Sequence, residues 1–280
     1  MHVYRWISLL LLPFALLAKP KIYDCFPFFN ELEVLEIRLS EMYDVVDYFV
    51  LVECRETFRG NPKPLHFERN KERFKKYSDK IIHIIVDEHV ETDNPWVREE
   101  FQKNQVIRGL KRCSDADIVI IGDLDEIIRA SDMKRLIKPI RSGKEKAVTA
   151  SQRFYRWYLN RRSKELPFWF GSVVSTYKYF KKRSFYKLRG DKDVYPKVHD
   201  VGWHFSNMGG MKRFIPKVEN FSHPEADTAE NKNPEYIRSY IQQELDLEAI
   251  DQTFPSFVRA YESELIRMEM IDFPGNNTYH

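Results

Sequence analysis

The sequence predicts an α/β fold in which a mostly parallel central sheet is flanked by helices. The prediction rests on short, uninterrupted apolar runs that alternate with segments of helical periodicity between residues 21 and 122. Uninterrupted apolar runs are typical of parallel strands buried on both faces, and the helices between them cover those faces. The chain has 280 residues, of which 43% are hydrophobic, so it can bury a large core.

The elements of this first half follow one another in a regular order. Four apolar runs are predicted to be strands, at residues 21–26, 48–53, 81–86 and 117–122. The segments between them are predicted to be helices, at residues 31–42, 68–80 and 95–111. Pro95 begins the last helix at a position where a missing N–H costs nothing. Ligands bind at the carboxyl ends of parallel strands, so a site is expected where these runs end.

The second half of the chain has a different composition. After Ala147, aromatic strand-like segments alternate with basic loops, and residues 224–248 are polar at first and then helical. Eleven Lys or Arg residues but one acid, Glu165, lie between residues 151 and 190, although the whole chain carries a net charge of only +3. This local field favours an anionic ligand or an acidic surface. Without an internal repeat or linker, residues 21–280 are interpreted as one continuous domain.

The first 20 residues are interpreted as a signal peptide or an uncleaved signal anchor. Arg5 precedes a mostly apolar stretch, Trp6 to Ala18, which is too short to span a bilayer comfortably. The protein is therefore expected in the secretory pathway or exported, as a lumenal, periplasmic or extracellular protein. Contact with a membrane is expected only through this segment, if it is uncleaved, and no nucleic-acid partner is expected.

The three cysteines, Cys25, Cys54 and Cys113, do not indicate a disulfide framework or a zinc site. Their number is odd, and the sequence has no CxxC motif or Cys/His cluster. Cys25 and Cys54 lie in or beside apolar runs. They are predicted to be buried as small hydrophobic side chains.

Two acids follow the fourth apolar run, in the segment IVIIGDLDE at residues 118–126. Residues i and i+2 of an extended backbone point the same way, so Asp123 and Asp125 are predicted to converge on one cation. Mg²⁺ binds through one or two carboxylates together with substrate phosphates. An Asp-x-Asp sequence alone is more often a solvated turn. Its place after a buried strand and Gly122 favours the metal site.

Five ordered blocks make the sequence resemble glycosyltransferase family 17, the group of the β-1,4-mannosyl-glycoprotein 4-β-N-acetylglucosaminyltransferase. The blocks are IYDCFPFFNE at 22–31, FVLVE at 49–53, KIIHII at 80–85, GDLDE at 122–126, and GWHFS at 202–206 with MGG at 208–210. The resemblance extends from about Lys21 to about Glu225.

The resemblance implies an A-type glycosyltransferase fold and an inverting mechanism. It also implies UDP-N-acetylglucosamine as the donor, Mn²⁺ or Mg²⁺ as the cofactor, and a mannose-containing glycan or related acceptor. Residues 21–130 are then the nucleotide-sugar half, which ends in the Asp-x-Asp, and residues 131–280 are the acceptor and site-completing half. Trp157 or Trp169 is expected to face the acceptor, whereas the other aromatic side chains pack.

His204 is proposed as a further metal ligand, or as a hydrogen-bond donor to the diphosphate. A-type folds commonly supply a late His to this site, although a core role between Trp203 and Phe205 is the simpler alternative. His223 is the rival for the same role.

The donor is expected to contact Glu53, Asn104, Arg108 and Asp123. Glu53 ends the second predicted strand, near the expected nucleoside. Asn104 and Arg108 share an inward stripe with Val97 and Phe101 on the helix before the Asp-x-Asp, and the planar guanidinium of Arg108 suits phosphate. A solvated strand end and a cap or ion pair are the alternative roles.

An inverting transfer needs a carboxylate base for the acceptor hydroxyl. Asp200 is the first candidate because it precedes the glycine block at 202–210. Asp191, Asp193 and Glu225 are the rivals, and a surface acid is the simpler interpretation of each of the four taken singly.

Two other classes of function use the same acids. A secreted carbohydrate-binding module would bind Ca²⁺ through them and catalyse nothing, so it would not cleave UDP-sugars. A phosphohydrolase would need further His and Asp ligands for a two-metal site, and no such cluster lies near Asp123 in the sequence.

Overall fold

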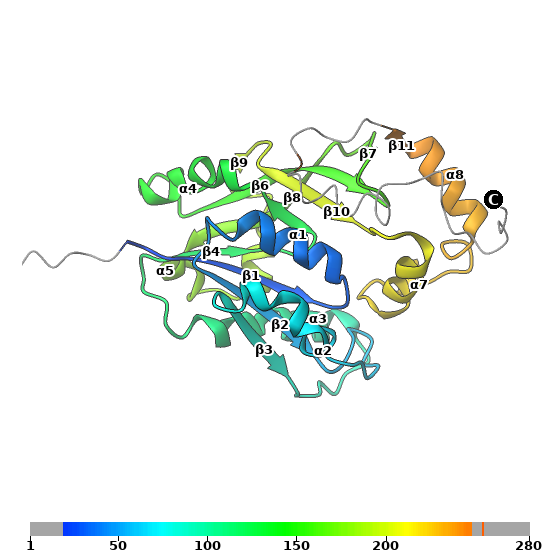
Figure 1. Cartoon of the computed structure of the whole chain (residues 1–280), viewed down its shortest axis with the longest axis horizontal. Helices are drawn as coiled ribbons and strands as arrows, with labels where there is room; N and C mark the ends of the chain where they lie inside the picture. Colours follow the sequence, from blue (N-terminus) through cyan, green and yellow to red (C-terminus); the bar gives the residue numbers. More distant parts are fainter. Residues whose placement is uncertain (1–18, 248–253, 255–280) are drawn as a thin grey trace, which may run out of the picture.

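The computed structural model describes residues 19–247 and Phe254, and these residues form an eleven-stranded sheet with helices on both faces (Figure 1). The expected α/β class is confirmed. The predicted leader at residues 1–20 lies almost entirely outside the described residues. Within the described part of the chain, no helix combines the length and the apolar character that crossing a membrane requires.

The predicted parallel sheet is present in the first half of the chain. The strands β1 (Ile22–Phe28), β2 (Tyr48–Cys54), β3 (Ile81–Val86) and β4 (Ile118–Ile121) lie in the spatial order β4-β1-β2-β3. All three pairings between them are parallel. The carboxyl ends of β1, β2 and β4 therefore meet at one edge of the sheet.

The helices of this half are shorter than the periodicity predicts. Helix α1 (Leu32–Met42) matches its predicted range, but the other two predicted helices are split. The second consists of α2 (His66–Asn70) and a 3₁₀ segment, η1 (Lys71–Tyr77). The third consists of α3 (Pro95–Asn104) and η2 (Gln105–Leu110). The apolar spacing alone does not distinguish i→i+4 from i→i+3 hydrogen bonding.

The predicted inward stripe on the third helix is wrong for Val97, although Phe101 packs against an apolar layer of the core. Val97 is 44% exposed, and α3 instead buries Arg98, Glu99, Gln102 and Lys103. The helix therefore turns charged side chains towards the protein interior. Burying such groups is costly unless they are paired, so partners for them must lie on neighbouring elements.

The second half adds antiparallel strands to the same sheet. Strand β8 (Phe168–Thr176) lies antiparallel to β4 and to β6 (Ala147–Arg156). Strand β10 (Gly202–Ser206) lies parallel to β6 and antiparallel to β5 (Glu126–Ile128). The remaining strands are β7 (Arg161–Ser163), β9 (Lys197–Val198) and β11 (Leu245–Leu247). The first half of the sheet is thus all parallel, whereas the second half combines antiparallel pairs with the parallel pairs of β6 with β9 and β10, and the whole sheet is mixed.

The helices of the second half lie around this sheet. They are α4 (Met133–Arg141), α5 (Tyr177–Phe180), α6 (Phe185–Gly190), α7 (Gly210–Asn220) and α8 (Pro234–Glu244), with 3₁₀ turns η3 (Ala130–Asp132) and η4 (Pro224–Ala226). In Figure 1, α5 lies near the start of β1, whereas α7 lies beyond its carboxyl end.

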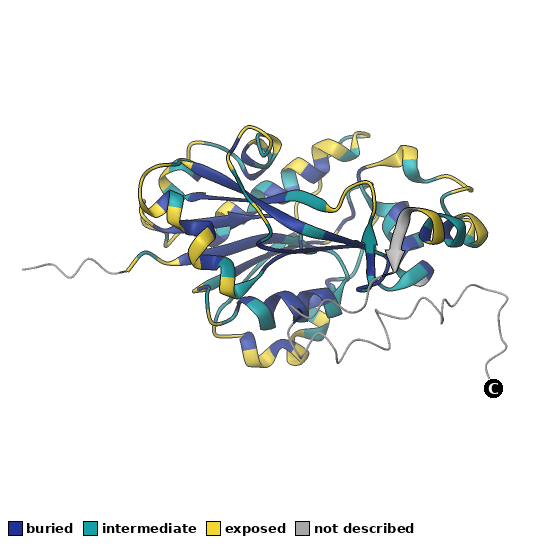
Figure 2. Ribbon diagram, turned by 90° about the horizontal axis from the view of Figure 1, so that it is seen from above, coloured by how far each residue is buried: buried dark blue, intermediate teal, exposed yellow. Residues whose placement is uncertain are grey.

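Alternate residues of the strands fill two apolar layers, one on each face of the sheet. Phe26 of β1 faces α1, and Cys25 faces the opposite layer, which η2 covers. Figure 2 shows the strands as the most continuously buried part of the molecule. Cys25 and Cys54 are buried as free thiols, which confirms their predicted role, and Cys113 is half-buried. A third cluster joins α7 and α8 to Trp157.

Candidate functional site

The acidic segment lies in the turn between β4 and β5, at the carboxyl edge of the parallel strands. A cavity of about 400 Å³ opens at this edge. Asp123, Asp125 and His204 line it, as do Lys103 on α3, Lys217 on α7 and Trp169 on β8. The three residues proposed to hold a metal therefore line one cavity, although His204 lies 79 positions beyond Asp125 in the chain.

A buried ion pair holds the backbone of this turn. Arg38 of α1 contacts Asp24 of β1 through Nη2 at 2.6 Å and Nε at 2.7 Å, and both side chains are fully buried. The Arg38 Nη1 atom donates to the carbonyl oxygens of Asp123, Leu124 and Glu126 at 2.8–3.0 Å. Asp24 of the first family block thus orients the guanidinium that shapes the acidic turn.

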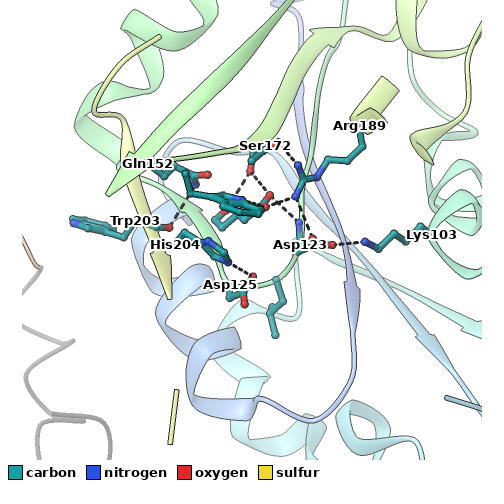
Figure 3. Close-up of polar contacts among 12 residues, drawn as sticks. Lys103, Asp123, Asp125, Gln152, Ser172, Arg189, Trp203 and His204 are labelled. Atoms are coloured by element: carbon teal, nitrogen blue, oxygen red, sulfur yellow. Dashed lines mark hydrogen bonds and ion pairs between the residues drawn. The ribbon is translucent and has the colours of Figure 1, made fainter. Parts of the chain in front are cut away.

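The Asp123 carboxylate forms ion pairs with two basic side chains, those of Lys103 and Arg189 (Figure 3). Its Oδ1 atom lies 2.7 Å from Lys103 Nζ, and its Oδ2 atom lies 3.2 Å from Arg189 Nη2. Burial would raise the pKa of Asp123, but Lys103 and Arg189 outweigh it and hold that pKa well below its usual range. Asp123 is therefore ionised, and both of its oxygens have partners.

The Asp125 carboxylate faces His204 and Lys217. Its Oδ1 atom lies 3.3 Å from His204 Nε2, and its Oδ2 atom lies 3.6 Å from Lys217 Nζ. Burial acts to raise the pKa of Asp125, but His204 and Lys217 lower it to about 2. The His204 ring is stacked on Phe154 at a centroid distance of 4.8 Å and contacts Trp169. Packing thus fixes the ring with Nε2 towards the acid.

Glu126, like Lys103, Arg189 and Lys217, is a residue beside the acidic turn that the sequence alone did not indicate. Its carboxylate is fully buried, accepts a hydrogen bond from Trp169 Nε1 at 2.7 Å and pairs with Arg189. The backbone N–H of Asp123 donates to it at 3.1 Å. Glu126 thereby links the acidic turn to Trp169 and Arg189. A Cβ at Gly122 would lie 2.3 Å from Ser172 Oγ and 2.8 Å from Glu126 Oε2, so the glycine makes room for the Glu126 carboxylate.

Gly171→Ala is expected to lower the free energy of unfolding by about 1–3 kcal/mol, the usual cost of overpacking. The added Cβ would lie 2.5 Å from the Glu126 carboxyl carbon and 2.7 Å from Trp169 Cδ1. Urea unfolding measures the loss. Gly190→Ala is the matched control, because no atom lies within 4 Å of its added Cβ. Equal stabilities of the two variants would contradict the expectation.

Three residues expected at the donor have other partners. The Glu53 carboxylate is fully buried and accepts the backbone N–H of Phe67 at 2.9 Å, at the start of α2. Asn104 accepts the Tyr186 N–H at 3.1 Å, and Arg108 pairs with Glu88 at the surface. None of these three residues belongs to the described lining of the cavity. Strand-end position and helical spacing did not reveal these local hydrogen bonds.

Asp200, the first candidate for the base, forms ion pairs with two arginines. Its oxygens lie 2.8–2.9 Å from Arg153 and 3.3 Å from Arg129. Burial raises its pKa, but Arg153 and Arg129 outweigh that effect and lower it. The described lining of the cavity includes neither Asp200 nor its rivals Asp191, Asp193 and Glu225. A carboxylate with a lowered pKa and two ion-pair partners is a poor proton acceptor.

The remaining candidates divide between the cavity and the core. His223 lines the cavity but is 46% exposed in its side chain, and it pairs with Glu225 at 2.7 Å. Trp169 also lines the cavity, as expected for one of the two tryptophans. Trp157 is 2% exposed and packs on Phe214, so its role is structural.

The donor set of the turn fits a hard divalent cation only in part. Ligands of an octahedral cation with bonds of about 2.1 Å lie about 3 Å apart. The 3.3 Å between Asp125 Oδ1 and His204 Nε2 is close to this value. Within the described residues, however, no three His, Cys, Asp or Glu side chains converge on one point. A cation here would therefore take its other ligands from substrate and water.

The comparison with protein-family models shows the family of this chain. The model of glycosyltransferase family 17 matches residues 14–269. The human and rat β-1,4-mannosyl-glycoprotein 4-β-N-acetylglucosaminyltransferases are each 27% identical over 106 residues, or 35% of this chain. That match spans 20% of the length of these relatives. A mannosyltransferase from Pyrobaculum calidifontis, solved with GDP-Man and Mn²⁺, has a TM-score of 0.46 and 11% identity, covering 88% of this chain and 75% of that chain.

Proposed function

The chain belongs to glycosyltransferase family 17 and is a glycosyltransferase, and from this premise we propose that it moves N-acetylglucosamine from UDP-N-acetylglucosamine to a mannose-containing glycan, with inversion. The observation that carries the proposal is the acidic turn, which lines a cavity of about 400 Å³ together with Lys103 and Lys217. Acids for a cation and cations for phosphate are the two groups that a nucleotide-sugar site combines. We also propose that the protein acts in a secretory or exported compartment.

The lining of the cavity suits the two parts of a donor. Phe28, Phe29 and Phe58 line it together with Thr57 and Gln102. Aromatic faces and a few polar groups suit a nucleoside. Asp123, Asp125 and Trp169 also line it, and beside them the diphosphate and the transferred sugar would lie.

A divalent cation, Mn²⁺ or Mg²⁺, would be held by Asp125 and His204, with Asp123 beside them. When bound, it would stabilise the negative charge of the departing diphosphate. The Arg38–Asp24 pair keeps the turn in place, and Glu126 keeps Trp169 and Arg189 in place. Glu31 takes the place of Asp200 as the base that accepts the proton of the acceptor hydroxyl. Its carboxylate lines the cavity and lies 3.8 Å from Lys217 Nζ.

The proposal is tested by a screen of UDP-, GDP- and CMP-sugars for turnover with mannose-containing glycans, with and without Mn²⁺. We expect turnover with UDP-N-acetylglucosamine that requires the cation. Turnover restricted to another donor would contradict the donor assignment. Binding of glycans in Ca²⁺ without cleavage of any nucleotide sugar would instead indicate a carbohydrate-binding module.

His204→Ala is expected to weaken Mn²⁺ binding in the presence of UDP by at least about tenfold, because it removes a ligand beside Asp125. His223→Ala is the matched control, since this ring also lines the cavity but pairs with Glu225. Titration calorimetry measures the affinities, and thermal unfolding measures stability. If His204→Ala mainly lowers the melting temperature, or if only His223→Ala changes the metal affinity, then His204 is not a ligand.

A further inference from the structure

The cavity contains lysine side chains that its acids hold in place. Lys103 Nζ lies between Glu99 at 2.6 Å and Asp123 at 2.7 Å. Lys217 Nζ lies 3.6 Å from Asp125 and 3.8 Å from Glu31. The two lysines come from α3 and α7, in different halves of the chain, and each contacts a different acid of the turn.

The burial of Lys103 is unlike that of a surface ion pair. Its side chain is 9% exposed, as is that of Glu99, yet both line the cavity. Apolar residues of similar volume usually stabilise a buried site as well as an ion pair does. The cost of desolvating these charges is therefore unexplained by folding alone, and it points to a ligand that uses them.

Lys217 has the contacts of a side chain that is free to change partner. Both of its carboxylate contacts exceed 3.5 Å, and the side chain is 28% exposed. Arg189 differs, because it also pairs with Glu126, which is fully buried. Arg189 is thus committed to the protein, whereas both lysines lie on the cavity wall.

We propose that Lys103 and Lys217 bind the diphosphate of the donor and, in doing so, release Asp123 and Asp125 for the divalent cation. This inference rests on the proposed function. Without a diphosphate, Lys103 occupies Asp123 Oδ1 and Lys217 lies beside Asp125 Oδ2, so each lysine competes with the cation for a carboxylate. With a diphosphate, each ammonium has phosphate oxygens as a replacement partner. Nucleotide and cation therefore bind cooperatively, and by linkage each raises the affinity of the other.

The test is titration calorimetry on the full chain with three probes: Mn²⁺ alone, UDP with Mn²⁺, and uridine, which lacks phosphate. In the unaltered protein we expect weak binding of Mn²⁺ alone and an affinity at least about tenfold higher with UDP, the range of measured couplings. Lys103→Met is expected to lower the affinity for UDP by about ten- to hundredfold, the effect of one charged hydrogen-bond partner. It is also expected to raise the affinity for Mn²⁺ alone, and to leave uridine binding unchanged.

Two further variants guard the test against misfolding. Lys217→Met changes a partly exposed side chain and is expected to show the same pattern, while Lys178→Met, on the exposed surface of α5, should match the unaltered protein. Suppose that UDP and Mn²⁺ bind to the unaltered protein but neither Lys103→Met nor Lys217→Met lowers the affinity for UDP; then the inference is wrong and the proposed function stands. The same conclusion follows if Mn²⁺ binds to the unaltered protein equally well with and without UDP. If UDP does not bind under any condition, both are wrong.

Discussion

Replacing Asp125 with asparagine is expected to lower kcat by about three orders of magnitude, which corresponds to about 4 kcal/mol of activation free energy. Asp125 is the acid that faces both His204 and Lys217, at 3.3 and 3.6 Å. Asparagine keeps the shape of the side chain but removes the charge that a cation and Lys217 both need. The Asp123→Asn variant is expected to lose activity as well, through the contacts to Lys103 and Arg189.

Initial rates of transfer at saturating Mn²⁺ measure the effect, and Asp115→Asn is the control. Asp115 is an exposed acid that pairs with Lys181 away from the cavity, so its loss should leave kcat unchanged. Near-normal turnover of Asp125→Asn would contradict the metal assignment.

Stability has to be compared at neutral pH in these variants. Because the folded-state pKa of Asp125 is lowered to about 2, its carboxylate stabilises the protein above the unfolded value of about 4. This contribution is lost progressively as the pH falls from about 4 to about 2. The Asp125→Asn variant lacks this contribution at every pH. A cooperative unfolding transition shows that the fold of the variant is intact.

Replacing Arg38 with methionine is expected to lower the free energy of unfolding by about 3–5 kcal/mol, the usual cost of breaking a buried ion pair. The change leaves Asp24 charged and without its partner in a fully buried position. It also leaves three carbonyl oxygens of the acidic turn without their donor. The folded fraction is therefore expected to lose turnover too, because the turn would no longer be held for Asp123 and Asp125.

Urea unfolding measures the stability of this variant, and Arg55→Met is the matched control. Arg55 pairs with Asp87 at the surface, where both side chains are more than half exposed, so its loss should cost less than about 1 kcal/mol. The double variant Asp24→Asn/Arg38→Met removes the stranded charge and is expected to recover part of the loss. Equal losses for Arg38→Met and Arg55→Met would show that the buried pair does not hold the turn.

The sequence by itself determined the α/β class, the four parallel strands and the family. Strands buried on both faces must be apolar along their whole length, so local composition is enough to reveal them. It also identified Asp123 and Asp125, since a turn that directly follows such a strand lies at the carboxyl edge of the sheet. The blocks around Asp24 and His204 marked further site segments without indicating what those residues contact.

The tertiary structure alone decided which charges surround the acids. Lys103, Arg189 and Lys217 come from α3, α6 and α7, and the helical spacing of α3 even favoured the wrong face. Asp200, Glu53 and Arg108 were assigned from position along the chain, but their partners are side chains or backbone groups that only folding brings near. The reason is physical: apolar periodicity reports burial within one element, whereas the pairing of charges depends on distances between elements far apart in the sequence.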